Sequence, residues 1–253
     1  MTTFTLAAFL LLFSLAPAVG TAAATPPLLD SDEIVSELLL HNAQRQLFLT
    51  GYEGMRLYAL ENERMHKHAE MLVRVTCNPD GSKQFQVVAQ EGWKAANKHV
   101  LLKMLASEEE TSRPEERVKT QLNTQNYSFR AAGTEQLNGR LTYVLEVSPK
   151  RHEKYLFKGR IWVDADDFAV IRAEGEPAKR PSFWTRSIHF VQTYEKNGSY
   201  WFPTLTQSRT QAFIFGATDV SIQYFAYRPK TASIEPSTAS VGKKVSEAVK
   251  PSN

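Results

Sequence analysis

The segment KGRIWVD, residues 158–164, is followed after an acidic turn by FAVIRAEG, residues 168–175, and this pair indicates the fold class most clearly. Apolar side chains alternate with polar or small ones, as in strands that bury one face. The turn from Asp164 to Asp167 consists of residues that favour tight turns. We therefore expect an antiparallel hairpin of two strands, at 155–164 and 168–174.

Strand and turn signals continue on both sides of this hairpin. Asn78-Pro79-Asp80-Gly81 is a turn in which proline presets one dihedral angle and glycine supplies the positive one. The other predicted strands lie at 49–60, 65–77, 83–90, 127–134, 141–148, 184–196, 200–209 and 217–227. About ten strands in hairpin succession predict a curved antiparallel sheet in a mainly β (α+β) protein.

Two regions have helical spacing instead. Asp30 or Ser31 is a suitable N-cap for a helix over 31–46. A helical insertion is predicted over 93–123, with Val100, Leu101, Met104 and Leu105 on one side; within it, Ser112 to Glu115 has the pattern of a capping box with a proline just inside the helix. We expect these helices to shelter the apolar face of the sheet.

The first residues have the order of a secretory signal peptide. An apolar run, Leu6 to Leu15, precedes Pro17 and the small residues Ala18 to Ala24. Cleavage fits after Gly20 or after Ala24, and we prefer Ala24, although the leader has no Lys or Arg. A membrane anchor needs about 20 apolar residues, more than this run provides. The sequence predicts a periplasmic protein with a signal peptide at 1–24, one domain at 25–230 and a disordered tail at 231–253.

Composition and motifs argue against several functions. The chain has 30 Lys and Arg against 27 Asp and Glu, a net charge of +3, and no basic block that indicates nucleic-acid binding. Its one cysteine, Cys77, is far from the signal-peptide junction and predicts neither a disulfide nor a lipid anchor. No common catalytic motif occurs. We predict a monomer that is not an enzyme, has no cofactor and does not span the membrane.

Two groups of side chains raise the question of a metal. His66 and His68, with Glu70 nearby, would share one face of a strand and offer two imidazole ligands to zinc, although polar residues on a wet face explain them more simply. The turn with Asp164, Asp166 and Asp167 lacks the glycine and distal glutamate of a calcium loop. We predict no metal site at either place.

Apolar residues at alternate strand positions, together with the apolar side of the insertion, form one candidate ligand-binding face. Its members are Met71, Val73, Val75, Phe85, Val87, Val100, Leu101, Met104, Phe157, Ile161, Ile171, Trp184, Ile188, Phe190, Tyr194, Ile222 and Tyr224. They could be a filled core beneath the helices or the lining of a cavity. The predicted strands outnumber the helical cover, which permits a cavity.

The order of elements, with Lys158 to Asp164, Phe168 to Gly175, Tyr194 to Gly198 and Trp201 to Pro203, resembles the LolA/LolB-like family of outer-membrane lipoprotein-sorting proteins, which is related to the lipid-sensing domain of the RseB/MucB regulators. The resemblance implies an unclosed half-barrel whose concave face receives acyl chains. The basic residue that holds the lid of the sorting carrier shut has no counterpart that we can identify in the sequence.

Three functions follow from these observations. The first is a periplasmic carrier that holds an acyl chain of a lipid or lipoprotein, or another apolar ligand. The second is an envelope sensor or scaffold that binds a protein partner through the same fold. The third is a metal-dependent hydrolase that uses His66 and His68.

Overall fold

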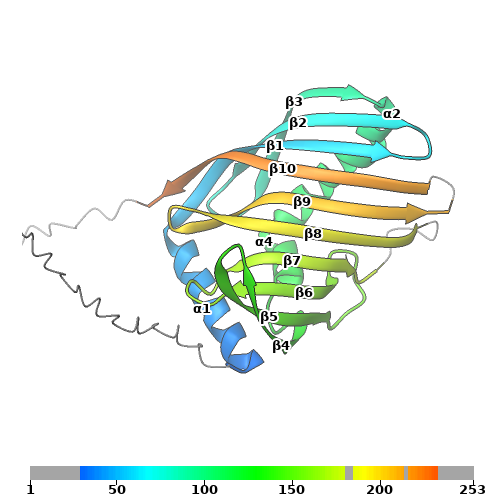
Figure 1. Ribbon diagram of the computed structural model, residues 1–253. Coiled ribbons are helices and arrows are strands. Elements are labelled where there is room, and N and C mark those ends of the chain that lie inside the picture. The colour runs from blue at the N-terminus through cyan, green and yellow to red at the C-terminus, as the bar shows by residue number, and fades with distance from the viewer. Residues whose placement is uncertain (1–28, 180–184, 214–215, 233–253) are drawn as a thin grey trace, which may run out of the picture.

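The computed structural model describes residues 29–179, 185–213 and 216–232. Within these ranges ten strands form one antiparallel sheet in the order β3-β2-β1-β10-β9-β8-β7-β6-β5-β4 (Figure 1). The strands are β1 (Leu49–Asn62), β2 (Lys67–Cys77), β3 (Lys83–Gly92), β4 (Tyr127–Leu137), β5 (Arg140–Pro149), β6 (Phe157–Asp164), β7 (Val170–Pro177), β8 (Thr185–Asn197), β9 (Tyr200–Ala212) and β10 (Gly216–Thr231). The edge strands β3 and β4 do not pair with each other in the described chain, so the predicted half-barrel is confirmed.

Helix α1 (Ser31–Phe48) begins at a capping box. The Asp30 carboxylate accepts the backbone N–H groups of Asp32 and Glu33 at 2.8 and 2.9 Å, and the Glu33 carboxylate accepts the backbone N–H of Asp30. Its apolar stripe, centred on Ile34 and Leu38, is buried in a cluster with residues of β4 to β7. Helix α1 therefore covers that half of the sheet.

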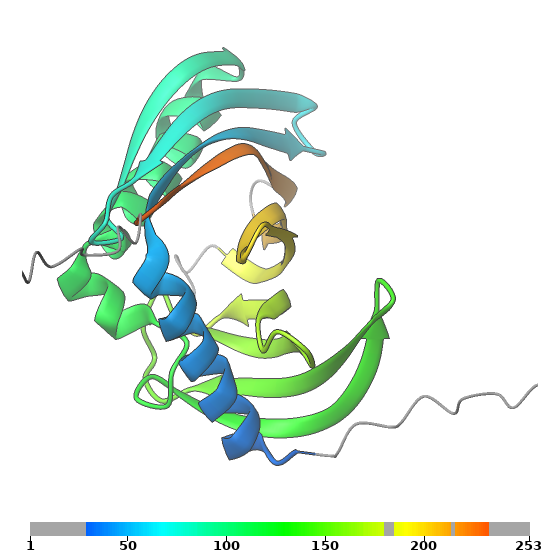
Figure 2. The same ribbon diagram turned by 90° about the vertical axis from the view of Figure 1, so that its left-hand side faces the viewer.

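The helical insertion covers the other half. It consists of α2 (Lys94–Ala96), a π-helical turn (Asn97–Leu101), α3 (Leu102–Ser112) and α4 (Pro114–Thr120). Leu101 and Leu105 pack against Tyr58, Met71 and other residues of β1, β2 and β10. Figure 2 shows α1 and the insertion lying along one side of the curling sheet. The prediction that helices shelter the concave face is confirmed.

Two local predictions are wrong. Ser112 does not cap α4: it stays in the last turn of α3, where its hydroxyl accepts the Lys83 backbone N–H and donates to the Glu109 carbonyl, both at 2.8 Å. His66 is not a strand residue beside His68, because it lies in the β1–β2 turn with a positive φ of 49°. Proline at the start of α4 is confirmed.

Irregular pairing bends several strands. Register shifts occur at Ala131/Gly133, Trp162/Val163 and Thr193/Tyr194. Gly159 and Gly175 face each other across β6 and β7, where the backbones approach so closely that a Cβ on Gly159 would lie 2.6 Å from the Gly175 Cα. Bulges and close glycine pairs increase curvature. Further register shifts between β1 and β10 and between β2 and β3 bend the half of the sheet that the insertion covers.

Both chain ends extend beyond the described residues. The predicted signal peptide at 1–24 lies outside them, as does most of the predicted tail at 231–253. The first tail residues belong to the fold instead, because β10 continues to Thr231 and the Ala232 N–H donates to the Phe48 carbonyl at 3.1 Å. No helix in the described ranges is long and apolar enough to cross a membrane.

Candidate functional site

Most of the predicted ligand-binding residues fall into two groups, and five belong to neither. One group packs beneath the helical insertion in two adjoining buried clusters. It contains Met71, Val73, Val75, Phe85, Leu101, Met104, Ile222 and Tyr224. Met71, Val73, Val75 and Leu101 are fully buried, so this half of the face is a filled core.

The second group surrounds an open space. Phe157, Ile161, Phe190 and Tyr194 line a hollow of about 340 Å³ on the concave side. We call this space the concave hollow; its other lining residues are Asn42, Leu122, Ala169, Val170, Ala173, Gln192 and Trp201. Asn42 comes from α1, so the helix forms one wall and β6 to β9 form the other. The volume is at the lower end of the range for small-molecule pockets, about 300 to 1,000 Å³.

The remaining predicted residues do not line the concave hollow. Ile171 packs with Val144 and Trp162 instead, because the bulge beside Trp162 shifts the alternation of β7. Val87 is 38% exposed because β3 is an edge strand, and Val100 is 38% exposed because Leu101 and Leu105 form the buried stripe of the insertion. Ile188 borders a separate hollow beside Gly159 and Gly175. Trp184 lies outside the described residues.

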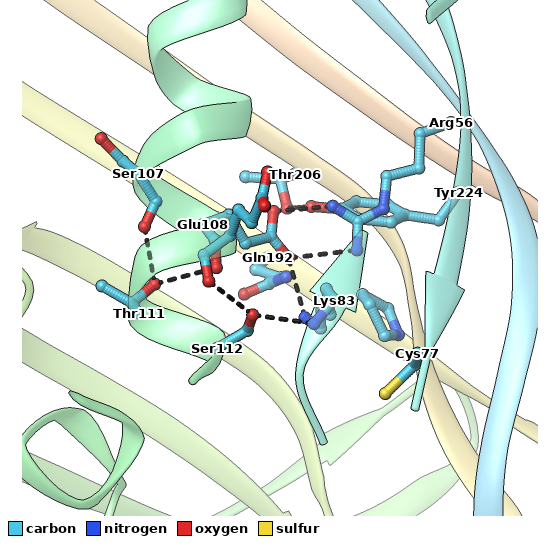
Figure 3. Close-up of polar contacts among 12 residues, drawn as sticks. Arg56, Cys77, Lys83, Ser107, Glu108, Thr111, Ser112, Gln192, Thr206 and Tyr224 are labelled. Carbon is cyan, nitrogen blue, oxygen red and sulfur yellow. Dashed lines mark hydrogen bonds and ion pairs between the residues drawn. The ribbon is translucent and has the colours of Figure 1, made fainter. Parts of the chain in front are cut away.

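An ionic cluster that sequence reasoning missed ties the insertion to the sheet (Figure 3). Arg56 on β1, only 1% exposed, donates to both carboxylate oxygens of Glu108 on α3, at 2.7 and 3.1 Å. Lys83 at the start of β3 donates to the same carboxylate at 2.7 Å. We call Arg56, Lys83 and Glu108 the lid cluster. A bidentate arginine contact fixes orientation as well as charge, so it positions α3 on the sheet.

Each charge in the lid cluster depends on the others. Burial opposes ionisation of Glu108. The positive charges of Lys83 and Arg56 outweigh the effect of burial and hold the pKa of Glu108 at about 2. Burial also opposes the charges on Lys83 and Arg56, and the Glu108 carboxylate raises the pKa of both above the usual range. All three groups are therefore charged at neutral pH.

Aromatic rings complete the surroundings of Arg56. Its guanidinium lies 4.8 Å from the centre of the Tyr224 ring and 5.2 Å from that of Phe85, distances typical of cation–π contacts. The Tyr58 hydroxyl accepts a further hydrogen bond at 3.2 Å. The sequence did contain one indication of the lid cluster. Arg56 lies between Gly54 and Tyr58 in the inward row of β1, where apolar residues are expected.

A second set of contacts fixes α1 beside the concave hollow. Arg45 donates to the backbone carbonyls of Asp167 and Phe168 at 2.8 and 3.0 Å. The His41 ring stacks on Phe168 with centroids 5.3 Å apart. These contacts hold the C-terminal half of α1 on the β6–β7 turn.

The side chains considered for metals have other partners. His68 contacts Glu61 at 2.5 Å and Glu70 at 3.4 Å on the sheet surface. Asp164 is bound by Arg140 and accepts the backbone N–H groups of Asp166 and Asp167. The described part of the chain contains no group of three or more His, Cys, Asp or Glu side chains placed to hold a metal ion.

Together these features describe a half-barrel with a helix-covered concave face, half of it filled and half hollow. A model of a family of unknown function, DUF5686, matches residues 121–228, which is less than half of the chain. No curated protein matches the sequence.

Solved structures similar to this chain include the kinds of protein that the sequence resembles. One is a putative outer membrane lipoprotein-sorting protein domain from Vibrio parahaemolyticus, 13% identical, with a TM-score of 0.42 over 80% of this chain and 95% of that one. Another is the LolA superfamily protein NE2245 from Nitrosomonas europaea, 9% identical, with a TM-score of 0.42 over 81% and 96%. The Pseudomonas aeruginosa MucA/MucB complex also matches, at 12% identity and a TM-score of 0.25 over 78% and 99%.

Proposed function

We propose that this protein is a periplasmic carrier without catalytic activity that holds an acyl chain, or another apolar group, in the concave hollow. The observation that carries the proposal is the lining itself. Phe157, Ile161, Val170, Phe190 and their neighbours offer aromatic and aliphatic surface in an open space, whereas the equivalent surface beneath the insertion is filled.

The energetics suit a hydrocarbon ligand. Each CH2 group removed from water contributes about 0.8 kcal/mol, so a chain needs dry surface and few directed polar contacts. Among the lining residues, Asn42, Gln192, Tyr194 and Trp201 carry polar groups. The Tyr194 hydroxyl donates to the Gln192 side chain at 3.1 Å, which satisfies part of this polarity internally.

Lipid extraction from the natively purified protein tests the proposal. We expect mass spectrometry to find copurifying lipid, and we expect lysophospholipid to displace a bound apolar dye from the delipidated protein. Absence of both lipid and displacement would exclude the carrier function.

A pair of neighbouring variants locates the ligand. Phe190 lines the concave hollow, whereas the adjacent Val191 lines a hollow with Glu61 and Arg209. Phe190→Asp places a charge among the apolar lining and is expected to abolish dye binding, while Val191→Asp leaves it within twofold. Equal effects of the two variants would place the ligand elsewhere.

An exposed apolar face on α1 supports a protein partner as a second candidate function. Leu40 is 51% exposed and Leu47, seven residues later on the same face, is 74% exposed. Exposed apolar side chains that gather on one face are common at protein contacts. Crosslinking in envelope extract, with Leu47→Ser as the matched variant, tests this candidate. A partner lost in Leu47→Ser, together with an empty concave hollow, would favour it over the carrier.

A further inference from the structure

The lid cluster contains more positive than negative charge. Arg56 and Lys83 carry two positive charges, and Glu108 neutralises one of them. Among the described residues, no other carboxylate is a main influence on the pKa of either cation. Buried charges are ordinarily paired, so one uncompensated cation beneath the insertion favours binding of an anion.

Hydrogen-bond donors in the lid cluster are also unused. The Arg56 Nε is buried and has no hydrogen-bond partner among the described residues. The Lys83 ammonium has three N–H donors, and its one hydrogen bond to a described side chain goes to Glu108. Lys83 is 27% exposed and Glu108 31% exposed, so the carboxylate side of the cluster can be reached by a ligand.

Polar side chains join the lid cluster to the concave hollow. Tyr194 lines the hollow, and its hydroxyl lies close enough to the cluster for Lys83 to oppose the rise in its pKa that burial and Tyr224 cause. Figure 3 shows Gln192, another lining residue, among the side chains around Lys83 and Glu108. Arg56, Lys83 and Glu108 do not line the concave hollow themselves, so Tyr194 and Gln192 are the side chains that connect it to the lid cluster.

We propose that the lid cluster binds the anionic head group of an amphiphile, a carboxylate or a phosphate, whose hydrocarbon chain occupies the concave hollow. This inference rests on the proposed carrier function and adds the class of ligand. The head-group oxygens accept from Lys83 and Arg56 and compete with the Glu108 carboxylate.

Calorimetric titration with three probes tests the inference on the delipidated protein. The probes are dodecyl phosphate, monododecanoylglycerol and inorganic phosphate, the two amphiphiles being kept below their micelle concentrations. We expect dodecyl phosphate to bind at least tenfold more tightly than the neutral amphiphile, and inorganic phosphate to bind at least 100-fold more weakly than dodecyl phosphate. This comparison needs only the unmodified protein.

Variants of the lid cluster separate charge recognition from folding. Lys83→Met is expected to remove the preference for dodecyl phosphate while retaining the affinity for monododecanoylglycerol. Glu108→Gln removes the competing anion and is expected to strengthen dodecyl phosphate binding several-fold, the opposite of what damage to the fold would do. Lys158→Met is the matched control, because Lys158 is an exposed lysine of β6 outside the concave hollow.

The outcomes distinguish the inference from the proposed function. If dodecyl phosphate and monododecanoylglycerol bind equally well, the carrier function stands and the proposal of an anionic head group is overturned. If inorganic phosphate binds as tightly as dodecyl phosphate, the cluster is a site for a free anion and the inference is again overturned. If neither amphiphile binds, the carrier function and the inference fail together.

Discussion

Arg56 occupies a position where a strand beneath a helical cover ordinarily carries an apolar side chain. Taking its charge out of water costs several kcal/mol, and the bidentate contact with Glu108 offsets that cost only while the carboxylate is present and ionised. The attachment of α3 to the sheet through Arg56 therefore depends on the negative charge of Glu108. An apolar residue at position 56 would hold the insertion without this condition.

Removal of the carboxylate is expected to leave two unpaired cations under α3. We expect Glu108→Ala to lower the free energy of unfolding by about 3 kcal/mol, near the lower end for a broken buried ion pair because Glu108 is partly exposed. Urea denaturation followed by circular dichroism measures the change. The matched control, Glu63→Ala, breaks an exposed pair with Arg209 and should change stability much less. Equal losses in the two variants would show that the lid cluster contributes no more than a surface pair.

Stability should also depend on the ionisation of Glu108. Its pKa falls from an ordinary 4.5 to about 2 in the folded protein, so its contribution is fully present above about pH 4.5 and is lost as the pH falls towards 2. The shift corresponds to about 3 kcal/mol. The difference in unfolding free energy between the unmodified protein and Glu108→Gln should therefore be largest near neutral pH and shrink below pH 4. A difference that stays constant between pH 7 and pH 3 would contradict this assignment.

Both helical covers combine an apolar stripe with polar contacts, but they differ in how local those polar contacts are. Helix α1 depends on an apolar stripe, a capping box and the Arg45 contacts, and most of this could be read from the sequence because Asp30, Glu33 and the leucine spacing are local signals. The insertion has an apolar stripe of its own, at Leu101 and Leu105. Its ionic attachment, however, depends on Lys83 and Arg56, which are 25 and 52 residues from Glu108 along the chain. No local pattern links them, so the lid cluster could not be predicted.

The capping box of α1 gives a prediction for a single element. Asp30→Ala removes the acceptor for two backbone N–H groups and is expected to cost about 1 kcal/mol of stability. Asp30→Asn keeps an acceptor and should restore most of the loss, whereas Asp32→Ala, two residues later in the first turn of α1, should have a smaller effect. Urea denaturation compares the three variants. Equal stability of Asp30→Ala and the unmodified protein would mean that α1 is held by its apolar stripe alone.

At the scale of the whole molecule, turn signals and alternation predicted a succession of antiparallel strands in a curved sheet, and the family resemblance implied that the sheet stays open. The pairing of β1 with β10 joins strands from opposite ends of the fold and had no such local signal. These signals did not predict which part of the concave face is filled and which part is hollow. Ile171 was assigned to that face by alternation, but a bulge at Trp162 turns it to a different cluster. Bulges depend on pairing with a neighbouring strand, so alternation within one strand cannot reveal where one face is filled and where it is hollow.

The glycine pair of β6 and β7 links this curvature to the concave hollow. A Cβ at Gly159 would overlap the Glu174 carbonyl oxygen and approach the Gly175 Cα at 2.6 Å, so the two backbones must separate. Because Phe157 and Ile161, on either side of Gly159, line the hollow, Gly159→Ala should disturb binding and stability together. We expect a loss of about 2 kcal/mol in unfolding free energy, within the usual range for a substitution that strains the backbone, and weaker binding of an apolar dye. Lys158→Ala, an exposed neighbour on the same strand, should change neither. If Gly159→Ala retains full stability and dye affinity, the close approach of β6 and β7 does not shape the hollow, and its form must be set by α1 instead.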